Sequence, residues 1–321
     1  MTGSKVIGLV GASGFVGSAV RDCLEQAGHS VVPIVAPRLT TSLRGVDQLI
    51  EFARSTGDTK KIADRLEGLD AVINAAGNPD ASSTRADALF GANALLPRIV
   101  AEAAATMSVP RMVHVSSAVV QNDRPVLDES EELFPFSPYS ASKVAGEVVL
   151  RTQPVAATSM TRYRPPSVHA PSRRVTRRVA RIASSPLASV AAPGTQPSPQ
   201  ALLTNVADAI SYLATCQQTP PPVVVHPWEG LTAEDVMLVL GGGRKPIKIP
   251  PTVARTVVTA GRMAGRAIAP AASNARRVEL LWLGQRQATS WLTTAGWTPP
   301  AGVDAWRELG RTVSASNSRS N

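Results

Sequence analysis

The feature that most constrains the fold is the stretch KVIGLVGASGFVGSAV, which begins at Lys5. An apolar run typical of a buried strand leads into three glycines, Gly11, Gly14 and Gly17, and a helical pattern follows. The N-terminus of a helix carries unpaired N–H groups and a partial positive charge, and glycine lets a phosphate approach that backbone closely. The order strand, glycine turn, helix therefore predicts a phosphate-binding turn at the start of an α/β sheet.

Strand-like and helical segments alternate through the first half of the chain. The pattern predicts strands in 5–10, 30–35, 70–77, 111–120 and 156–168, and helices in 18–28, 62–69, 88–107 and 137–152. Segment 37–60 could hold a helix and shows no clear strand pattern. The alternation predicts an α/β fold with a Rossmann-like, doubly wound parallel sheet.

The second half differs in composition, since proline and small residues become frequent after about Pro165. Helical patterns remain in 202–214, 232–240, 253–268 and 276–297. We expect a dinucleotide-binding Rossmann domain over 1–165, completed by about 200–226. A smaller C-terminal, substrate-binding lid would take 166–199 and 227–312, and 313–321 would be a disordered tail.

The chain has 321 residues, of which 44% are hydrophobic, so it can bury a large core. We find no apolar run near twenty residues, which argues against a membrane-spanning helix. The apolar run near the N-terminus feeds the glycine turn and is interpreted as a strand, not a signal peptide. Two distant cysteines, Cys23 and Cys216, predict neither a disulfide framework nor a metal site, and a reducing cytoplasm is expected.

The net charge of +9 is concentrated in two segments. Seven arginines and no acid lie in 162–181, and eight Lys or Arg and no acid lie in 236–278. Such segments are often solvated surface, but they could also bind an anionic small molecule, an acidic surface or nucleic acid. Nucleic acid ranks last, because aromatic residues make up only 4% of the chain and do not interleave with the basic runs.

The end of the second predicted strand bears on cofactor preference. NAD-binding chains usually place Asp or Glu there, to bind the ribose hydroxyls. This chain reads PIVAPRLTTSLR, with Arg38 and then Arg44 and no acid. A guanidinium would bind a 2′-phosphate, so NADP is favoured over NAD, unless Arg38 is only a solvated loop residue.

A second group of residues follows the fourth strand. Tyr139 and Lys143 are four apart in a helical segment, so their side chains share one face. The strand RMVHVSS brings Ser116 and Ser117 to its carboxyl end, the edge at which open α/β sheets bind ligands. With only three tyrosines in the chain, chance coincidence of these features is the weaker interpretation.

Together these motifs resemble those of the extended short-chain dehydrogenases/reductases, in the NAD-dependent epimerase/dehydratase group. The resemblance spans roughly residues 3–310. Its elements are the G-x-x-G-x-x-G turn, Asn74-Ala75-Ala76-Gly77, Asn93, VSSAVV at 115–120, Tyr139-x-x-x-Lys143, RPPSVHAP at 164–171 and TTAGWTPP at 293–300.

The resemblance implies a role for each matching residue. Tyr139 would be the general acid/base, its phenolate stabilised by Lys143 and a bound nicotinamide. Ser117 would hydrogen-bond the substrate oxygen, with Ser116 in reserve, and Asn93 would support Lys143 through water. The expected cofactor contacts are Gly11, Ser13, Gly14, Phe15, Val16, Gly17, Arg38, Asn74, Ala75, Ala76, Gly77, Asn93, Val115, Tyr139, Lys143, Pro166, Ser167 and Val168, and the expected substrate contacts are Ser117, Tyr139 and Arg277.

The reaction type is narrowed by departures from the family's patterns. Dehydratases of the group carry Asp-Glu after the hydroxyl residue, where this chain has Ala118-Val119. Sugar-nucleotide members often have Asn where Ser167 stands. Arg277, however, precedes Trp297 by twenty residues, similar to the phosphate-binding arginine of UDP-galactose 4-epimerase.

We therefore expect an NADP(H)-dependent ketoreductase with an anionic substrate, for which a keto-sugar nucleotide is the leading candidate. An NAD-dependent nucleotide-sugar epimerase is the first alternative, and a non-catalytic NADP-binding sensor is the alternative from another class. Members of the family often form dimers through a contact that includes the Tyr139 helix, so a homodimer stays open.

Overall fold

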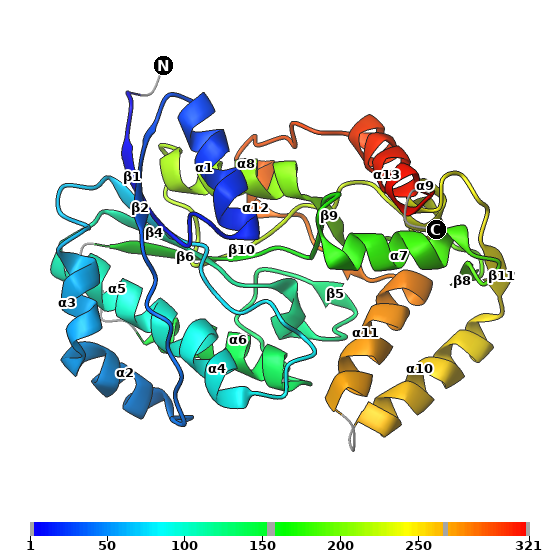
Figure 1. Cartoon of the computed structure of the whole chain (residues 1–321), viewed down its shortest axis with the longest axis horizontal. Coiled ribbons are helices and arrows are strands. Elements are labelled where there is room, and N and C mark those ends of the chain that lie inside the picture. Colours follow the sequence, from blue (N-terminus) through cyan, green and yellow to red (C-terminus); the bar gives the residue numbers. More distant parts are fainter. Residues whose placement is uncertain (1–2, 153–157, 266–268, 319–321) are drawn as a thin grey trace.

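A parallel six-stranded sheet organises the larger lobe of the protein (Figure 1), in a computed structural model that describes residues 3–152, 158–265 and 269–318. The strand order is β10-β6-β4-β3-β1-β2, so β2 lies on one side of β1 and the later strands, from β3 on, lie on the other. The strands are β1 (Val6–Val10), β2 (Ser30–Ile34), β3 (Ala71–Asn74), β4 (Arg111–Val115), β6 (Ser159–Arg164) and β10 (Val223–Val225).

Helices cover both faces of this sheet, as expected for a doubly wound fold (Figure 1). One face carries α1 (Phe15–Gln26), α8 (Leu203–Thr215) and α12 (Trp291–Thr294). The other carries α2 (Val46–Ser55), α3 (Gly57–Ala63), α4 (Ala86–Phe90), the π-helical turn η1 (Gly91–Leu95), α5 (Leu96–Thr106) and α6 (Pro138–Arg151). The prediction of a Rossmann-like α/β fold is confirmed, and segment 37–60 holds helix without a strand.

The stretch Ala86–Thr106 runs as one continuous helix through α4, η1 and α5. Among the described helices it alone has the length and composition to cross a membrane, but 78% of its most apolar window is buried inside the protein. It contributes Leu95, Ile99 and Val100 to the core beneath the sheet. These contacts are those of the core helix of a globular protein.

The smaller lobe, the lid, packs around its own core (Figure 1). Its helices are α7 (Arg174–Ser184), α9 (Ala233–Leu240), α10 (Pro251–Gly265), α11 (Ala269–Leu283) and α13 (Val303–Ser318). Short strands pair around it: β5 (Val126–Leu127) with β12 (Arg286–Gln287), β7 (Ser167–His169) with β9 (Gln200–Leu202), and β8 (Ser189–Ala191) with β11 (Ile247–Ile249).

The end of the chain departs from the prediction of a disordered tail from residue 313. Helix α13 continues to Ser318, and Val313 is buried in the lid core with Trp306 and Leu309. The sequence SASNS is a weak helix former, but the apolar face ahead of it docks the helix and carries it on. The last three residues lie outside the described part of the chain.

Candidate functional site

A cleft of about 800 Å³ opens at the carboxyl edge of the sheet, between the two lobes. It is lined by most of the predicted site residues: Gly11, Ser13, Gly14, Phe15, Val16, Arg38, Ala75, Ala76, Gly77, Val115, Ser117, Tyr139, Lys143, Pro166, Ser167, Val168 and Arg277. Three predicted contacts lie outside this lining and would support the residues that form it: Gly17, Asn74 and Asn93. The fold therefore brings the glycine turn and the Tyr139 group to the same cleft.

The glycine turn is packed too tightly for any side chain. Gly11 has φ +85, and a Cβ there would lie 2.7 Å from the backbone nitrogen of Ala76. A Cβ on Gly17 would lie 2.0 Å from the carbonyl oxygen of Gly11. The first contact packs the end of β1 against the segment that follows β3, and the second packs the first turn of α1 against the end of β1.

Asn74 and Asn93 shape the wall from behind. The Asn74 side chain accepts a hydrogen bond from the Ala76 nitrogen at 3.1 Å. Asn93, in the π-helical turn, accepts from the Asn78 nitrogen at 2.9 Å and donates to the Asn78 carbonyl and the Ser142 hydroxyl, both at 3.0 Å. Its amide thus ties the loop beside Gly77 to helix α6.

Helix α6 begins where its sequence dictates. The Ser137 hydroxyl accepts from the Ser140 nitrogen at 3.1 Å, and the Ser140 hydroxyl accepts from the Ser137 nitrogen at 2.8 Å. This reciprocal cap, with Pro138 at the first helical position, fixes the start of the helix. Tyr139 consequently lies in the first turn, at the cleft, and Lys143 lies one turn further in on the same face.

Tyr139 and Ser117 both line the cleft, and the Ser117 hydroxyl acts to lower the pKa of the Tyr139 phenol. Burial raises the pKa of Tyr139, while the cations Arg173 and Arg277 and the Ser117 hydroxyl act to lower it. With the raised value, the phenol is protonated at neutral pH. The sequence predicts that Lys143 stabilises the phenolate, and the structure adds two arginines of the smaller lobe, Arg173 and Arg277, that act on the same phenol. Arg173 was not anticipated, since only the folded chain brings it to Tyr139.

Lys143 is 6% exposed and donates to the carbonyl oxygen of Val115 at 3.2 Å. Burial lowers its pKa from 10.5 to about 8, against an opposing effect of the Glu147 carboxylate. A Cβ on Gly77 would lie 2.9 Å from the Asn93 side-chain oxygen and 3.5 Å from the Lys143 nitrogen, so Gly77 packs closely against Asn93 beside this ammonium.

The two candidate serines have different surroundings. The Ser116 hydroxyl is buried and donates to Glu147 at 2.5 Å. Glu147 is itself paired with the buried Arg164, through hydrogen bonds of 2.9 and 2.6 Å. Both serines line the cleft, but the Ser116 hydroxyl is engaged by Glu147, and Ser117 is the serine that acts on the pKa of Tyr139.

The charge of the cleft has a single sign. None of the described residues that line it is Asp or Glu, and its charged members are Arg38, Lys143, Arg173, Arg276 and Arg277. Arg38 is exposed at the end of β2. Arg44, by contrast, pairs with Asp87 at 2.5 Å and stacks on Phe90, so it does not face the cleft.

The residues of the cleft suit a dinucleotide. The glycine turn offers an open helix N-terminus to a pyrophosphate, and the all-cationic lining suits a polyanion. Arg276 binds Glu279 at 2.7 Å and Gln285 at 2.5 Å. The other arginines of the lining, which could bind an anion, are Arg38, Arg173 and Arg277.

Solved structures share this fold over almost the whole chain. MoeE5 in complex with UDP-glucuronic acid and NAD has a TM-score of 0.63 at 19% identity, over 98% of this chain and 100% of that one. Human epimerase family protein SDR39U1 with NADPH has 0.66 at 17%, over 95% and 99%. The dTDP-4-dehydrorhamnose reductase of Bacillus anthracis with NADP has 0.60 at 15%, over 95% and 98%. At these identities the likeness is one of fold.

A profile of the NAD dependent epimerase/dehydratase family matches residues 7–217, more than half of the chain. The match covers the glycine turn, Ser117, Tyr139 and Lys143, and it confirms the family resemblance seen in the sequence. The chain belongs to the NAD dependent epimerase/dehydratase family and is an NAD(P)-dependent oxidoreductase or epimerase.

Proposed function

We propose that the protein is an NADP(H)-dependent reductase that acts on a carbonyl carbon of an anionic substrate. The observation that carries the proposal is that Ser117, Tyr139 and Lys143 line one cleft, and that the described lining of this cleft has no carboxylate. Dehydration in such clefts needs a carboxylate acid and base, so a tyrosine-only proton donor favours simple hydride transfer.

A bound nicotinamide would supply or accept the hydride. Tyr139, protonated because burial raises its pKa, donates its proton to the substrate oxygen as negative charge develops there. Ser117 hydrogen-bonds the same oxygen and orients it. The Lys143 ammonium lies on the same helix face and stabilises the phenolate that remains.

NADP is proposed over NAD because of the end of β2. Arg38 lines the cleft there and is exposed, ready to bind a 2′-phosphate bidentately. Arg38→Ala should weaken NADPH binding about tenfold and leave NADH binding nearly unchanged, because one charge-assisted contact would be lost. An equal loss of affinity for NADPH and NADH would contradict the binding of the 2′-phosphate by Arg38.

A keto-sugar nucleotide is the substrate that we propose, since Arg277 and Arg173 face the cleft from the lid. An NAD-dependent nucleotide-sugar epimerase is the second candidate, because MoeE5, which has the same fold, was solved with NAD and UDP-glucuronic acid. Mass spectrometry of small molecules released from the purified protein separates the two: tightly held NAD supports the epimerase.

The test of the reductase is Tyr139→Phe, assayed with NADPH and a panel of keto-sugar nucleotides. Loss of the proton donor should lower turnover at least about 100-fold and leave NADPH affinity nearly unchanged. Tyr212→Phe is the matched control, since its hydroxyl bonds the Ala295 carbonyl away from the cleft. Undiminished turnover in Tyr139→Phe would sink the assignment.

A further inference from the structure

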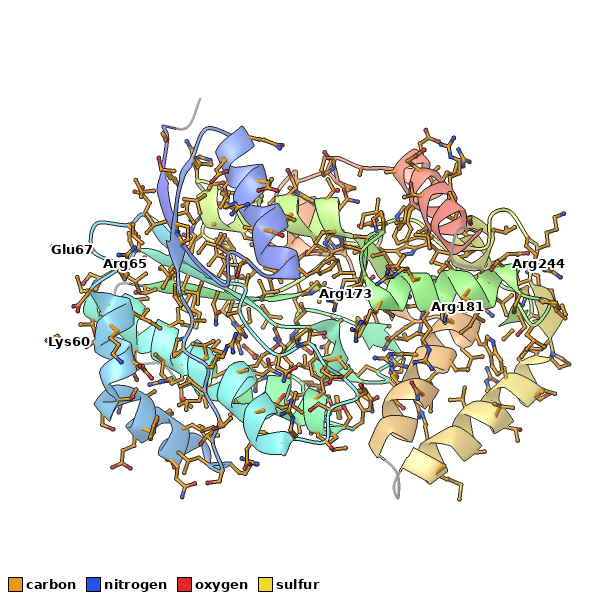
Figure 2. All side chains as sticks on the ribbon, viewed as in Figure 1. Lys60, Arg65, Glu67, Arg173, Arg181 and Arg244 are labelled. Carbon is orange, nitrogen blue, oxygen red and sulfur yellow. The ribbon has the colours of Figure 1, made fainter. Side chains whose placement is uncertain are left out.

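The basic segment 162–181 resolves into three kinds of arginine. Arg162 and Arg164 are buried within strand β6 and pair with Glu131 and Glu147. Four others are exposed on helix α7: Arg174, Arg177, Arg178 and Arg181. Of the seven arginines, Arg173 alone lines the cleft, at the N-cap of α7, while Arg181 lies near the other end of that helix (Figure 2).

The surroundings of Arg173 contain no counter-charge. Its guanidinium carbon lies 4.5 Å from the centroid of the Phe15 ring, and Phe15 is the first residue of helix α1. Within the described chain, its side chain makes no ion pair and no hydrogen bond to a protein group. Arg277, across the cleft, has an electrostatic partner in Asp80; Arg173 has no carboxylate partner.

A cation in this position is costly without a ligand. Arg173 is partly buried, and burial lowers the pKa of its guanidinium. Stacking on Phe15 recovers about 1 kcal/mol and fixes the orientation of the guanidinium plane. Arg173 lines the same cleft as Gly14 and Phe15 at the N-terminus of α1, which also attracts negative charge.

We propose that Arg173 is an oxyanion-binding residue of the lid, which holds a phosphate or pyrophosphate group between the first turn of α1 and Tyr139. The inference rests on the proposed function and adds a residue that the glycine turn alone does not supply. It also gives the lid a direct bond to the bound anion, since Arg173 begins helix α7 of the lid.

Two sources share this chemistry, the pyrophosphate of the dinucleotide and a phosphate of the substrate. Titration separates them, with NADPH as the probe of the first and UDP, added to the NADPH-loaded protein, as the probe of the second. Arg173→Met keeps an apolar stem over Phe15 and removes the charge. Arg177→Met, from the exposed side of the same helix, is the matched control, and Arg173→Lys tests whether a point charge suffices.

Arg173→Met should weaken one of the two ligands about tenfold to hundredfold, as expected for a lost charge-assisted contact. Arg173→Lys should recover part of that loss, and Arg177→Met should stay within about twofold of the wild type. Weaker NADPH identifies the cofactor as the source, and weaker UDP identifies the substrate. A folded Arg173→Met protein that binds both ligands like the wild type overturns the proposal.

Failure of the proposed function is distinguishable from failure of this inference. A wild-type protein that does not bind NADPH refutes the reductase. Inorganic pyrophosphate, titrated into the ligand-free protein, still tests Arg173 in that case: an unchanged affinity in Arg173→Met contradicts the oxyanion site, and a tenfold weaker one supports it. Circular dichroism and thermal unfolding of each variant confirm that the comparison is between folded proteins.

Discussion

At the scale of single residues, the ammonium of Lys143 is kept in the protein at a cost. Its pKa falls from 10.5 to about 8, which corresponds to about 3 kcal/mol of destabilisation while both folded and unfolded states are protonated. As the pH rises from 8 to 10.5, the folded state loses this proton first and the cost disappears. Lys143→Met removes this cost but also loses the hydrogen bond to Val115, so it should raise the free energy of unfolding at pH 7 by about 2 kcal/mol. At pH 9 the gain in stability should be about 1 kcal/mol smaller.

Urea unfolding at the two pH values measures this difference. Lys61→Met is the control, because Lys61 is exposed and pairs only with Asp58 on the surface, so its removal should change stability by less than about 0.5 kcal/mol. A Lys143→Met protein that is less stable than the wild type at pH 7, or whose gain does not depend on pH, contradicts the burial argument.

At the scale of elements, the sequence predicted what depends on neighbours along the chain. The strand, glycine turn and helix around Gly14, and the cap and spacing that place Tyr139 and Lys143, are written in short motifs. Arg173 and the helical end of α13 are set by contacts between segments far apart in sequence, so periodicity gave no sign of them. The choice between Ser116 and Ser117 also became visible only through Glu147.

Helix α6 and the π-helical turn η1 meet at a glycine. A Cβ on Gly146 would lie 2.0 Å from the carbonyl oxygen of Asn93, so Gly146→Ala should push α6 away from the turn. The strain should destabilise the protein by about 1–3 kcal/mol, more than alanine's helix preference returns, and should weaken NADPH through Lys143. Gly57→Ala, in the first turn of α3 with open space around it, should be neutral or stabilising. Equal thermal midpoints for both variants would rule out the close approach.

At the scale of the whole molecule, His169 joins segments of the smaller lobe that are far apart in the sequence. It lies on β7, directly after the cleft residues Ser167 and Val168. Its ring nitrogens lie 3.1 Å from the Thr176 hydroxyl on α7 and 2.8 Å from the Gln200 amide oxygen on β9. The ring also packs against Trp306 of α13, with centroids 5.5 Å apart. Burial disfavours a charge on this ring, and this effect outweighs the hydrogen bond to Gln200, which favours the charged form.

The fold should therefore be sensitive to mild acid. Burial lowers the pKa of His169 from 6.5 to about 4, so between these values the unfolded chain takes up a proton that the folded protein excludes. Stability from this group is present above pH 6.5 and is lost as the pH falls toward 4, by about 2 kcal/mol between pH 7.5 and pH 5.

His169→Gln should lose about 2 kcal/mol less than the wild type over that range, measured by urea unfolding followed by tryptophan fluorescence. His29→Gln, near the chain start and away from the His169 contacts, should keep the full acid sensitivity. If the free energy of unfolding depends on pH in the same way for His169→Gln and the wild type, protonation of His169 is not the cause of the acid sensitivity.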